Sequence, residues 1–160
     1  NNKCNYTVVS TGHKEDHRNS SYFDKIQKYI KVNNLQINYK YIGLVDYSEV
    51  ISLMYHCVAL INPSEFEGRH SSLEQARSLG KQMILSKINI HKEQSPPRTL
   101  YFNKDRSSQL AKLMKKTWSN YHPQKNSFYY YKAVRQNKLN LIKYYKDWEK
   151  VVTEVINFSY

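Results

Sequence analysis

Short apolar runs alternate with stretches of helical periodicity over the first two thirds of the chain. Runs rich in β-branched and aromatic residues predict strands at 6–11, 37–43, 58–61 and 82–86. Apolar residues at three- and four-residue intervals predict helices from 22 to the Asn33-Asn34 pair, over 47–57, and from Ser71 to the stop at Gly80. Strands that alternate with helices need crossover connections. We therefore expect an α/β fold with a parallel sheet covered on both faces.

The pattern changes after about residue 107. Residues 107–118 predict an amphipathic helix, residues 121–126 a proline-containing break, and the remainder to Ile156 two further helices without a strand. We therefore expect a domain over 1–120, with helices of 121–160 packing on the same domain. Apolar residues in the tail recur at intervals of three, four or seven, which favours contact with a neighbouring helix: Tyr130, Val134, Leu141, Tyr145, Trp148 and Val152.

Lysine and arginine outnumber the acidic residues, 25 to 13, for a formal net charge of +12. Such a chain attracts polyanions, phosphorylated ligands or an acidic membrane surface, although the excess need not have a dedicated partner. The aromatic and lysine residues of the tail could also form a stacking surface for single-stranded nucleic acid, an interpretation that we consider the weaker one.

Cysteine usage and hydropathy limit the compartment and the cofactors. Cys4 and Cys57 stand far apart, and no pair of cysteines or histidines has metal-ligand spacing. No apolar run approaches the roughly 18 residues of a membrane span, and no signal peptide opens the chain. We expect reduced thiols, a cytoplasmic location and no metal or cofactor.

The loop of residues 62–70 is the strongest candidate for a ligand site. It follows a predicted strand, and ligands of open α/β sheets bind at the carboxyl ends of the strands. The start of the next helix offers free N–H groups to a phosphate, with Arg69, His70, Ser71 and Ser72 beside flexible Gly68.

Carboxylates in that loop need a separate explanation. Glu67 fits a phosphate badly, but a carboxylate can accept hydrogen bonds from the hydroxyls of a sugar, and a nucleotide-sugar carries both groups. The alternatives are that Glu67 binds nearby backbone N–H groups and that His70 is a solvated histidine. Glu74, three residues after Ser71, is predicted to complete a capping box.

Several motifs in order resemble a known family. They are PSEFEG (63–68), SLEQARSLGKQMILS (72–86), INIHKEQSPPRTLYF (88–102) and LAKLMKKTW (110–118), with YKYIGLVDYSEVISLMYHCVALINPS (39–64) leading into the first. The series is similar to the donor-binding half of retaining glycosyltransferases of family 4, also called group 1. The resemblance runs from about Tyr6 to Trp118. It implies the Rossmann-like C-terminal domain of a GT-B enzyme, incomplete at its N-terminal side, and transfer of a sugar from a nucleotide-sugar with retention.

The resemblance also implies roles for individual residues. Glu67 matches the first glutamate of the family's Glu-x7-Glu motif, which holds the donor sugar, and is the implied catalytic residue, as an orienting and charge-stabilising group. The implied mechanism is front-face attack assisted by the departing phosphate, without a metal. The implied donor-binding set is Val45 near the base, Glu67, Gly68, Arg69, His70, Ser71, Ser72, Leu73 and Gln75.

Two departures from the family pattern stand out. Gln75 occupies the position of the second motif glutamate, so the charged acceptor for the ribose is replaced by an amide. The family's phosphate-binding Arg and Lys would precede Tyr6, and the acceptor-binding N-terminal domain is not in this sequence. We therefore expect a piece of a longer enzyme that transfers little sugar by itself. Its implied acceptor is a glycan or lipid-linked glycan, and the basic charge suits peripheral contact with a membrane's inner face.

Overall fold

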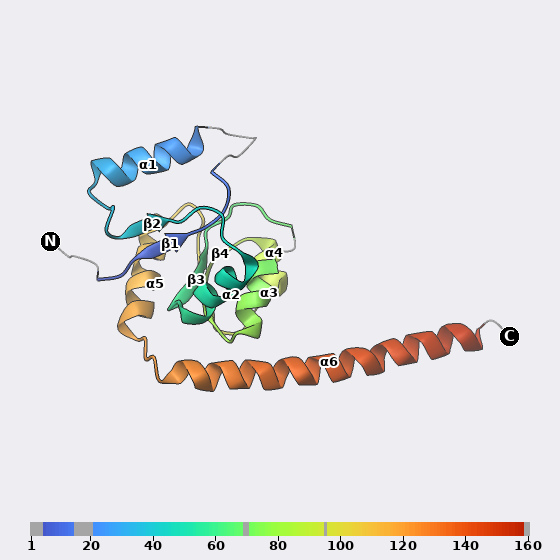
Figure 1. The fold of residues 1–160 in the computed structure, drawn as a ribbon. Coiled ribbons are helices and arrows are strands. Elements are labelled where there is room, and N and C mark those ends of the chain that lie inside the picture. The colour runs from blue at the N-terminus through green and yellow to red at the C-terminus, as the bar shows by residue number, and fades with distance from the viewer. Residues whose placement is uncertain (1–4, 15–20, 69–70, 95, 159–160) are drawn as a thin grey trace. The chain divides into compact units, whose positions relative to one another are not determined.

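The computed structural model describes residues 5–14, 21–68, 71–94 and 96–158. They form two compact units, Asn1–Leu53 and Met54–Tyr160. Helices and strands alternate along the chain up to β5, and two helices follow (Figure 1). Every strand pair is parallel, so the predicted α/β class with a Rossmann-like arrangement of strands and helices is confirmed.

The first unit holds a parallel pair of strands, β1 (Val8–Ser10) and β2 (Tyr39–Tyr41), joined through α1 (Tyr22–Val32). The Phe23 ring of α1 meets the Tyr41 ring of β2 edge-on, with 4.7 Å between centroids. Helix α1 ends at Asn33, and Asn34 has a positive φ of 54°, as the paired asparagines predicted. Helix α2 (Tyr47–His56) crosses the boundary into the second unit.

The second unit is built on a three-stranded parallel sheet in the order β3, β4, β5. The strands are β3 (Ala59–Asn62), β4 (Gln82–Ser86) and β5 (Thr99–Phe102). They are connected by α3 (Ser71–Ser78) and by the short α4 (Asn89–Gln94). Central strand β4 is the most buried, because it is paired on both sides and its residues 83–86 are inaccessible to solvent.

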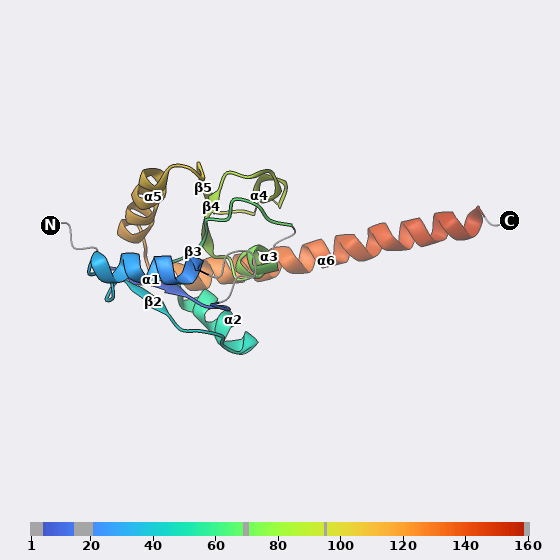
Figure 2. The same cartoon turned by 90° about the horizontal axis from the view of Figure 1, so that it is seen from above.

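The core of this unit lies between one face of the sheet and α3. Met83 and Leu85 point to the same face of β4, because successive strand residues alternate. Leu73 and Ala76 of α3 pack against them, helped by the partly buried Leu60. Helix α5 (Ser107–Ser119) contacts β4 and β5, and Figures 1 and 2 show it on the side of the sheet opposite α3.

Helix α3 ends at a glycine that the sequence predicted to be left-handed. Gly80 has φ 66°, its N–H donates to Arg77, and the N–H of Lys81 donates to Ala76, which is the Schellman arrangement. A Cβ at Gly80 would lie 2.3 Å from the carbonyl oxygen of Tyr129. Glycine is therefore required here both by the backbone angle and by the close approach of the first turns of α6.

The tail consists of one helix, α6 (Lys125–Asn157), after a break at residues 121–124. The prediction of two helices there was wrong, because the segment holds neither glycine nor proline to end a helix. Its early turns pack on α3, and Asn137 donates to the Ser78 carbonyl at 3.5 Å. Residues 138–158 are exposed throughout.

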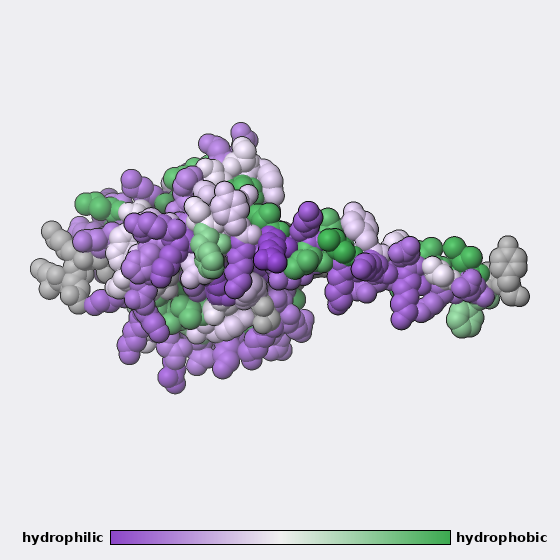
Figure 3. Space-filling model, turned by 90° about the horizontal axis from the view of Figure 1, so that it is seen from below, coloured by the Kyte–Doolittle hydropathy of each residue, from purple (hydrophilic) through white to green (hydrophobic). Residues whose placement is uncertain are grey.

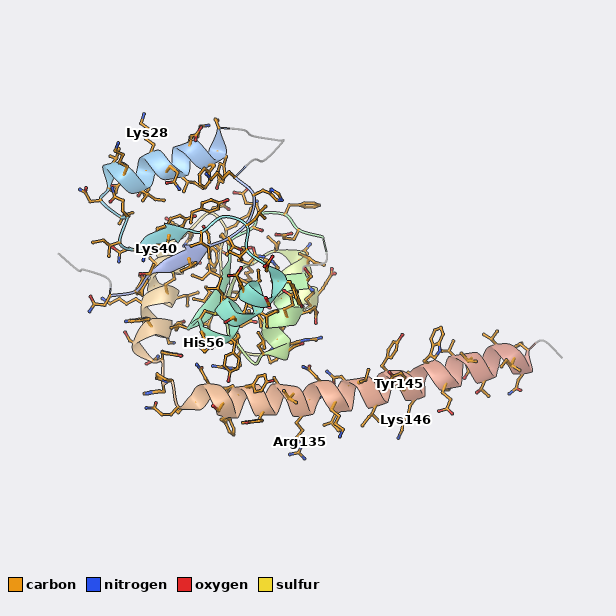
Figure 4. All side chains as sticks on the ribbon, viewed as in Figure 1. Lys28, Lys40, His56, Arg135, Tyr145 and Lys146 are labelled. Atoms are coloured by element: carbon orange, nitrogen blue, oxygen red, sulfur yellow. The ribbon has the colours of Figure 1, made fainter. Side chains whose placement is uncertain are left out.

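Most tail side chains expected to contact a neighbouring helix are uncovered in the described residues. Tyr130 meets Tyr55 of α2 edge-on at 5.4 Å between ring centroids. Leu141, Tyr145 and Trp148 are all at least half exposed, and apolar side chains along α6 are visible in Figure 3. Figure 4 shows the Arg135 and Lys146 side chains extending away from the same helix.

Helix α4 and strand β5 were not predicted from the pattern of residues. Both are short and lie on either side of Pro96 and Pro97. None of the helices within the described residues combines the length and apolarity needed to cross a bilayer.

Candidate functional site

The carboxyl ends of β3 and β4 form one edge of the sheet in the second unit, where Asn62 stands opposite Leu85. The loop of residues 63–68 leaves this edge toward α3. Asn62 is buried at 6% exposure, and its Oδ1 accepts a hydrogen bond from the Ser64 N–H at 2.9 Å. The turn after β3 is therefore fixed by the last side chain of the strand.

A second anchor comes from the end of β4. The buried Ser86 hydroxyl donates to the Ser64 carbonyl oxygen. His91 of α4, which is fully buried, places Nδ1 2.8 Å from the Ser86 carbonyl oxygen, so Nδ1 carries the proton and donates. The Tyr101 hydroxyl in turn donates to the His91 carbonyl at 3.0 Å. Two neighbouring strands and α4 thus hold the start of the loop.

Glu67 is oriented by the anchored part of this loop. The Ser64 hydroxyl donates to Glu67 Oε1 at 2.5 Å, and the Glu67 side chain is half-buried. Glu65 and Phe66 are exposed, so the loop turns one of its two carboxylates inward. A carboxylate held this way can accept hydrogen bonds from ligand hydroxyls without first losing much conformational freedom.

The first turn of α3 follows at the same edge of the sheet. The helix begins at Ser71, as predicted, with Ser71 exposed, Ser72 partly buried and Leu73 in the core. Leu73 therefore has a packing role that accounts for its side chain. Gln75 is partly buried and lies one turn into the helix.

Glu74 does not complete a capping box. Its carboxylate pairs with Arg77 one turn later and accepts a hydrogen bond from Gln94 of α4 at 3.4 Å. Arg77 and Gln94 therefore bind the carboxylate in place of the Ser71 N–H, which a capping box would use. Glu74 thus joins α3 to α4.

Three predicted site residues cannot be placed beside the Glu67 loop and the start of α3. Arg69 and His70 lie outside the described residues. Val45 belongs to the first unit, where it follows Gly43 and is partly buried. Gly68 is exposed, and a Cβ added to it would meet no atom within 4 Å. Of the predicted site residues, the second unit therefore carries Glu67, Gly68, Ser71, Ser72, Leu73 and Gln75 on one loop and the helix that follows it.

The opposite edge of the same sheet carries a buried lysine that the sequence analysis did not single out. Lys81, just before β4, is 5% exposed, and its Nζ donates to the Tyr55 carbonyl at 2.9 Å. Burial lowers the pKa of Lys81, with a smaller opposing contribution from Cys57 and a further lowering by Arg98. Burial raises the pKa of the Cys57 thiol, and the charge of Lys81 partly offsets this. Both groups lie within the second unit.

The described residues contain no cluster of three histidine, cysteine, aspartate or glutamate side chains arranged to hold a metal ion. The chain was also compared with protein-family models, curated proteins and solved structures. No family model, curated protein or solved structure matched it.

Proposed function

We propose that this chain is the donor-binding half of a retaining glycosyltransferase, which holds a nucleotide-sugar at the carboxyl edge of its parallel strands. The observation that carries the proposal is the inward carboxylate of Glu67, held by Ser64 on a loop anchored to two strands. The motif resemblance and the location at the carboxyl ends of the strands independently favour the same loop.

The proposed roles follow from the chemistry of each group. Glu67 accepts hydrogen bonds from donor-sugar hydroxyls and stabilises positive charge that develops at the anomeric carbon. The start of α3, with the Ser71 and Ser72 hydroxyls, faces the pyrophosphate, because N–H groups and the helix dipole favour an anion there. Gln75 binds a ribose hydroxyl through its amide.

Transfer also needs an acceptor beside the donor. A sugar hydroxyl attacks efficiently only when both reactants are held in one water-poor site, which the proposed N-terminal acceptor domain supplies. The departing phosphate removes the acceptor proton in this proposal, so that none of the described side chains needs to act as a general base.

Ligand-observed NMR of the chain with uridine, guanosine and adenosine diphosphate sugars tests donor binding. We compare the wild type with Glu67→Gln, which keeps the side-chain size, and with Glu65→Gln, a matched loss of one exposed carboxylate in the same loop. The proposal predicts transfer of saturation to the sugar protons of one donor. Glu67→Gln abolishes this signal, and Glu65→Gln leaves it intact.

The other outcomes identify the alternatives. Equal spectra for the two variants would remove Glu67 from the site. Silence from every nucleotide-sugar, together with salt-sensitive binding of a single-stranded oligonucleotide, would favour the nucleic-acid-binding class instead. Donor binding that depends on Glu67 without any transfer in the intact enzyme would indicate a non-catalytic sugar-nucleotide-binding domain.

A further inference from the structure

A cavity of about 280 Å³ opens at the amino-terminal edge of β4 and β5, the edge opposite the Glu67 loop. Its walls come from the starts of both strands, the end of α5, the break that follows and the first turn of α6. All of these segments belong to the second unit.

The charge of the cavity wall has one sign. Among the described residues, no aspartate or glutamate lines the cavity. Its basic wall residues are three lysines, one arginine and one histidine: Lys81, Lys116, Lys125, Arg98 and His122. Within the described residues none of the four lysine and arginine side chains forms an ion pair. The cavity therefore concentrates positive potential that no described carboxylate compensates.

The two innermost cations are held in place and keep donors to spare. The Arg98 guanidinium lies over the Tyr129 ring, with 3.4 Å between its central carbon and the ring centroid, and Nη1 donates to the Gly80 carbonyl. Lys81 donates one of its three N–H bonds to Tyr55. Lys81 is buried and Arg98 is partly buried, and this burial lowers the pKa of both groups. Such cations gain most from a bound anion.

Neutral donors complete the wall. Asn120 and Asn126 also line the cavity. The first turn of α6 adjoins it and contains no acidic residue, so the positive end of the helix dipole is not compensated there.

We propose that this cavity binds a small ligand through a phosphate monoester group. A phosphate dianion matches several converging N–H donors in a cationic pocket. Val58, Leu100 and the Tyr129 ring supply apolar wall for the remainder of the ligand. At about 280 Å³ the cavity is slightly below the usual range for drug-sized ligands, so it suits a ligand smaller than a nucleotide-sugar. This site is therefore distinct from the proposed donor site.

Calorimetric titration with inorganic phosphate and with glycerol 3-phosphate, at constant ionic strength, tests the proposal. The variant Lys116→Gln/Lys125→Gln removes two exposed cations from the cavity, and Lys112→Gln/Lys132→Gln removes the same charge from α5 and α6 outside it. We expect the cavity variant to raise Kd by at least about fivefold and the control to change it less than about twofold. Equal losses in the two variants would overturn the proposal.

Two further measurements are needed. The first distinguishes a lipid phosphate from a soluble one, and the second distinguishes the cavity from the proposed donor site. Phosphatidylcholine vesicles with and without phosphatidic acid present the same group on a lipid, and binding lost only in the cavity variant would assign the site to a lipid phosphate. The proposal is overturned if the wild type binds none of the three probes, which are inorganic phosphate, glycerol 3-phosphate and the phosphatidic acid vesicles. Ser71→Ala/Ser72→Ala must leave phosphate binding unchanged, because the proposed pyrophosphate subsite at the start of α3 is at the other edge of the sheet; a loss in that variant would place the phosphate in the donor site and also overturn it.

Discussion

The guanidinium of Arg98 lies on the face of the Tyr129 ring, with 3.4 Å between its central carbon and the ring centroid. The contact joins the residue before β5 to the second turn of α6, and Arg98 also donates to the carbonyl of Gly80 at the end of α3. Arg98 adopts a left-handed backbone angle, φ 61°, to reach both. One side chain therefore ties three elements of the second unit together.

Removal of the Tyr129 ring should loosen this junction. Tyr129→Leu is expected to lower the free energy of unfolding by about 1–2 kcal/mol, because a partly desolvated cation loses its aromatic face. Tyr129→Phe keeps the ring and should change it by less than about 0.5 kcal/mol. Urea unfolding followed by tryptophan fluorescence measures both variants, and equal effects would show that the phenol hydroxyl matters more than the ring.

Gly80→Ala should lower the free energy of unfolding by more than Gly43→Ala, although both glycines have a positive φ. Gly43 has φ 76° with open space around it, so Gly43→Ala carries only the cost of a left-handed alanine, about 1–2 kcal/mol. Gly80→Ala adds a clash with the Tyr129 backbone and should cost about 2–5 kcal/mol in total. Native-state hydrogen exchange reads the local cost in each unit separately. Similar costs would mean that α6 moves aside readily.

The stability of the second unit should depend on pH through Lys81. Burial lowers the pKa of Lys81 below its ordinary value of 10.5, so between these two values the unfolded chain binds more protons than the folded chain. The free energy of unfolding should therefore rise with pH over that window relative to Lys81→Met.

The comparison is best made in a Cys57→Ser background. The pKa of the Cys57 thiol is raised above 9.0 in the folded chain, so above pH 9.0 the folded chain binds more protons at this thiol than the unfolded chain does. The thiol therefore lowers the free energy of unfolding as pH rises, which opposes the effect of Lys81. Urea unfolding of both chains at a series of pH values up to 10.5 gives the difference directly. Parallel curves for the lysine and the methionine chain would contradict the prediction.

Cys57 should react slowly while the chain is folded. The thiol is partly buried, donates to the Met54 carbonyl at 3.2 Å, and has a raised pKa, so little nucleophilic thiolate is present. In a Cys4→Ser chain, alkylation by iodoacetamide should be at least roughly tenfold slower than in urea. Lys81→Met should slow it further if the variant remains folded, because the lysine charge lowers the thiol pKa. A rate equal to that of the unfolded chain would count against this environment.

Ser64→Ala should weaken the proposed donor binding, which depends on Glu67. Loss of the hydroxyl that orients the carboxylate is expected to raise the Kd of the nucleotide-sugar by about 3–10-fold. Ser78→Ala, an exposed serine in α3, is the matched control. The combined Ser64→Ala/Glu67→Gln chain should bind little worse than Glu67→Gln, since the serine acts through the glutamate. Additive losses would indicate that Ser64 contacts the ligand itself.

Much of the sheet could be predicted because its signals are local. The runs at 58–61 and 82–86 are strongly apolar, and Gly80 marks the end of α3 clearly. Strand β5 could not be separated from its surroundings, since Thr99–Phe102 is only four residues long and follows two prolines. Its place in the sheet depends on pairing with β4, which is a long-range interaction.

The candidate sites differ in the same way. Glu67 stands out because two carboxylates follow closely after the end of a strand, but its contact with Ser64 depends on the turn that Asn62 and Ser86 fix. The cavity at the opposite edge collects side chains from segments far apart in the chain. Neither spacing nor charge runs connect Lys81 with Lys125, because only the packing of α6 beside α3 brings them together.

The exposed part of α6 has a consequence for how the chain melts. Residues 138–158 have no buried side chain, so their helical state is not coupled to the packing of the sheet. Most helical stability in proteins comes from packing of an apolar face, so a helical segment without such packing loses order gradually on warming. Helical ellipticity should therefore decline over a broad range of temperature before the second unit unfolds, and a partner that covers the apolar side of α6 would make the two transitions coincide.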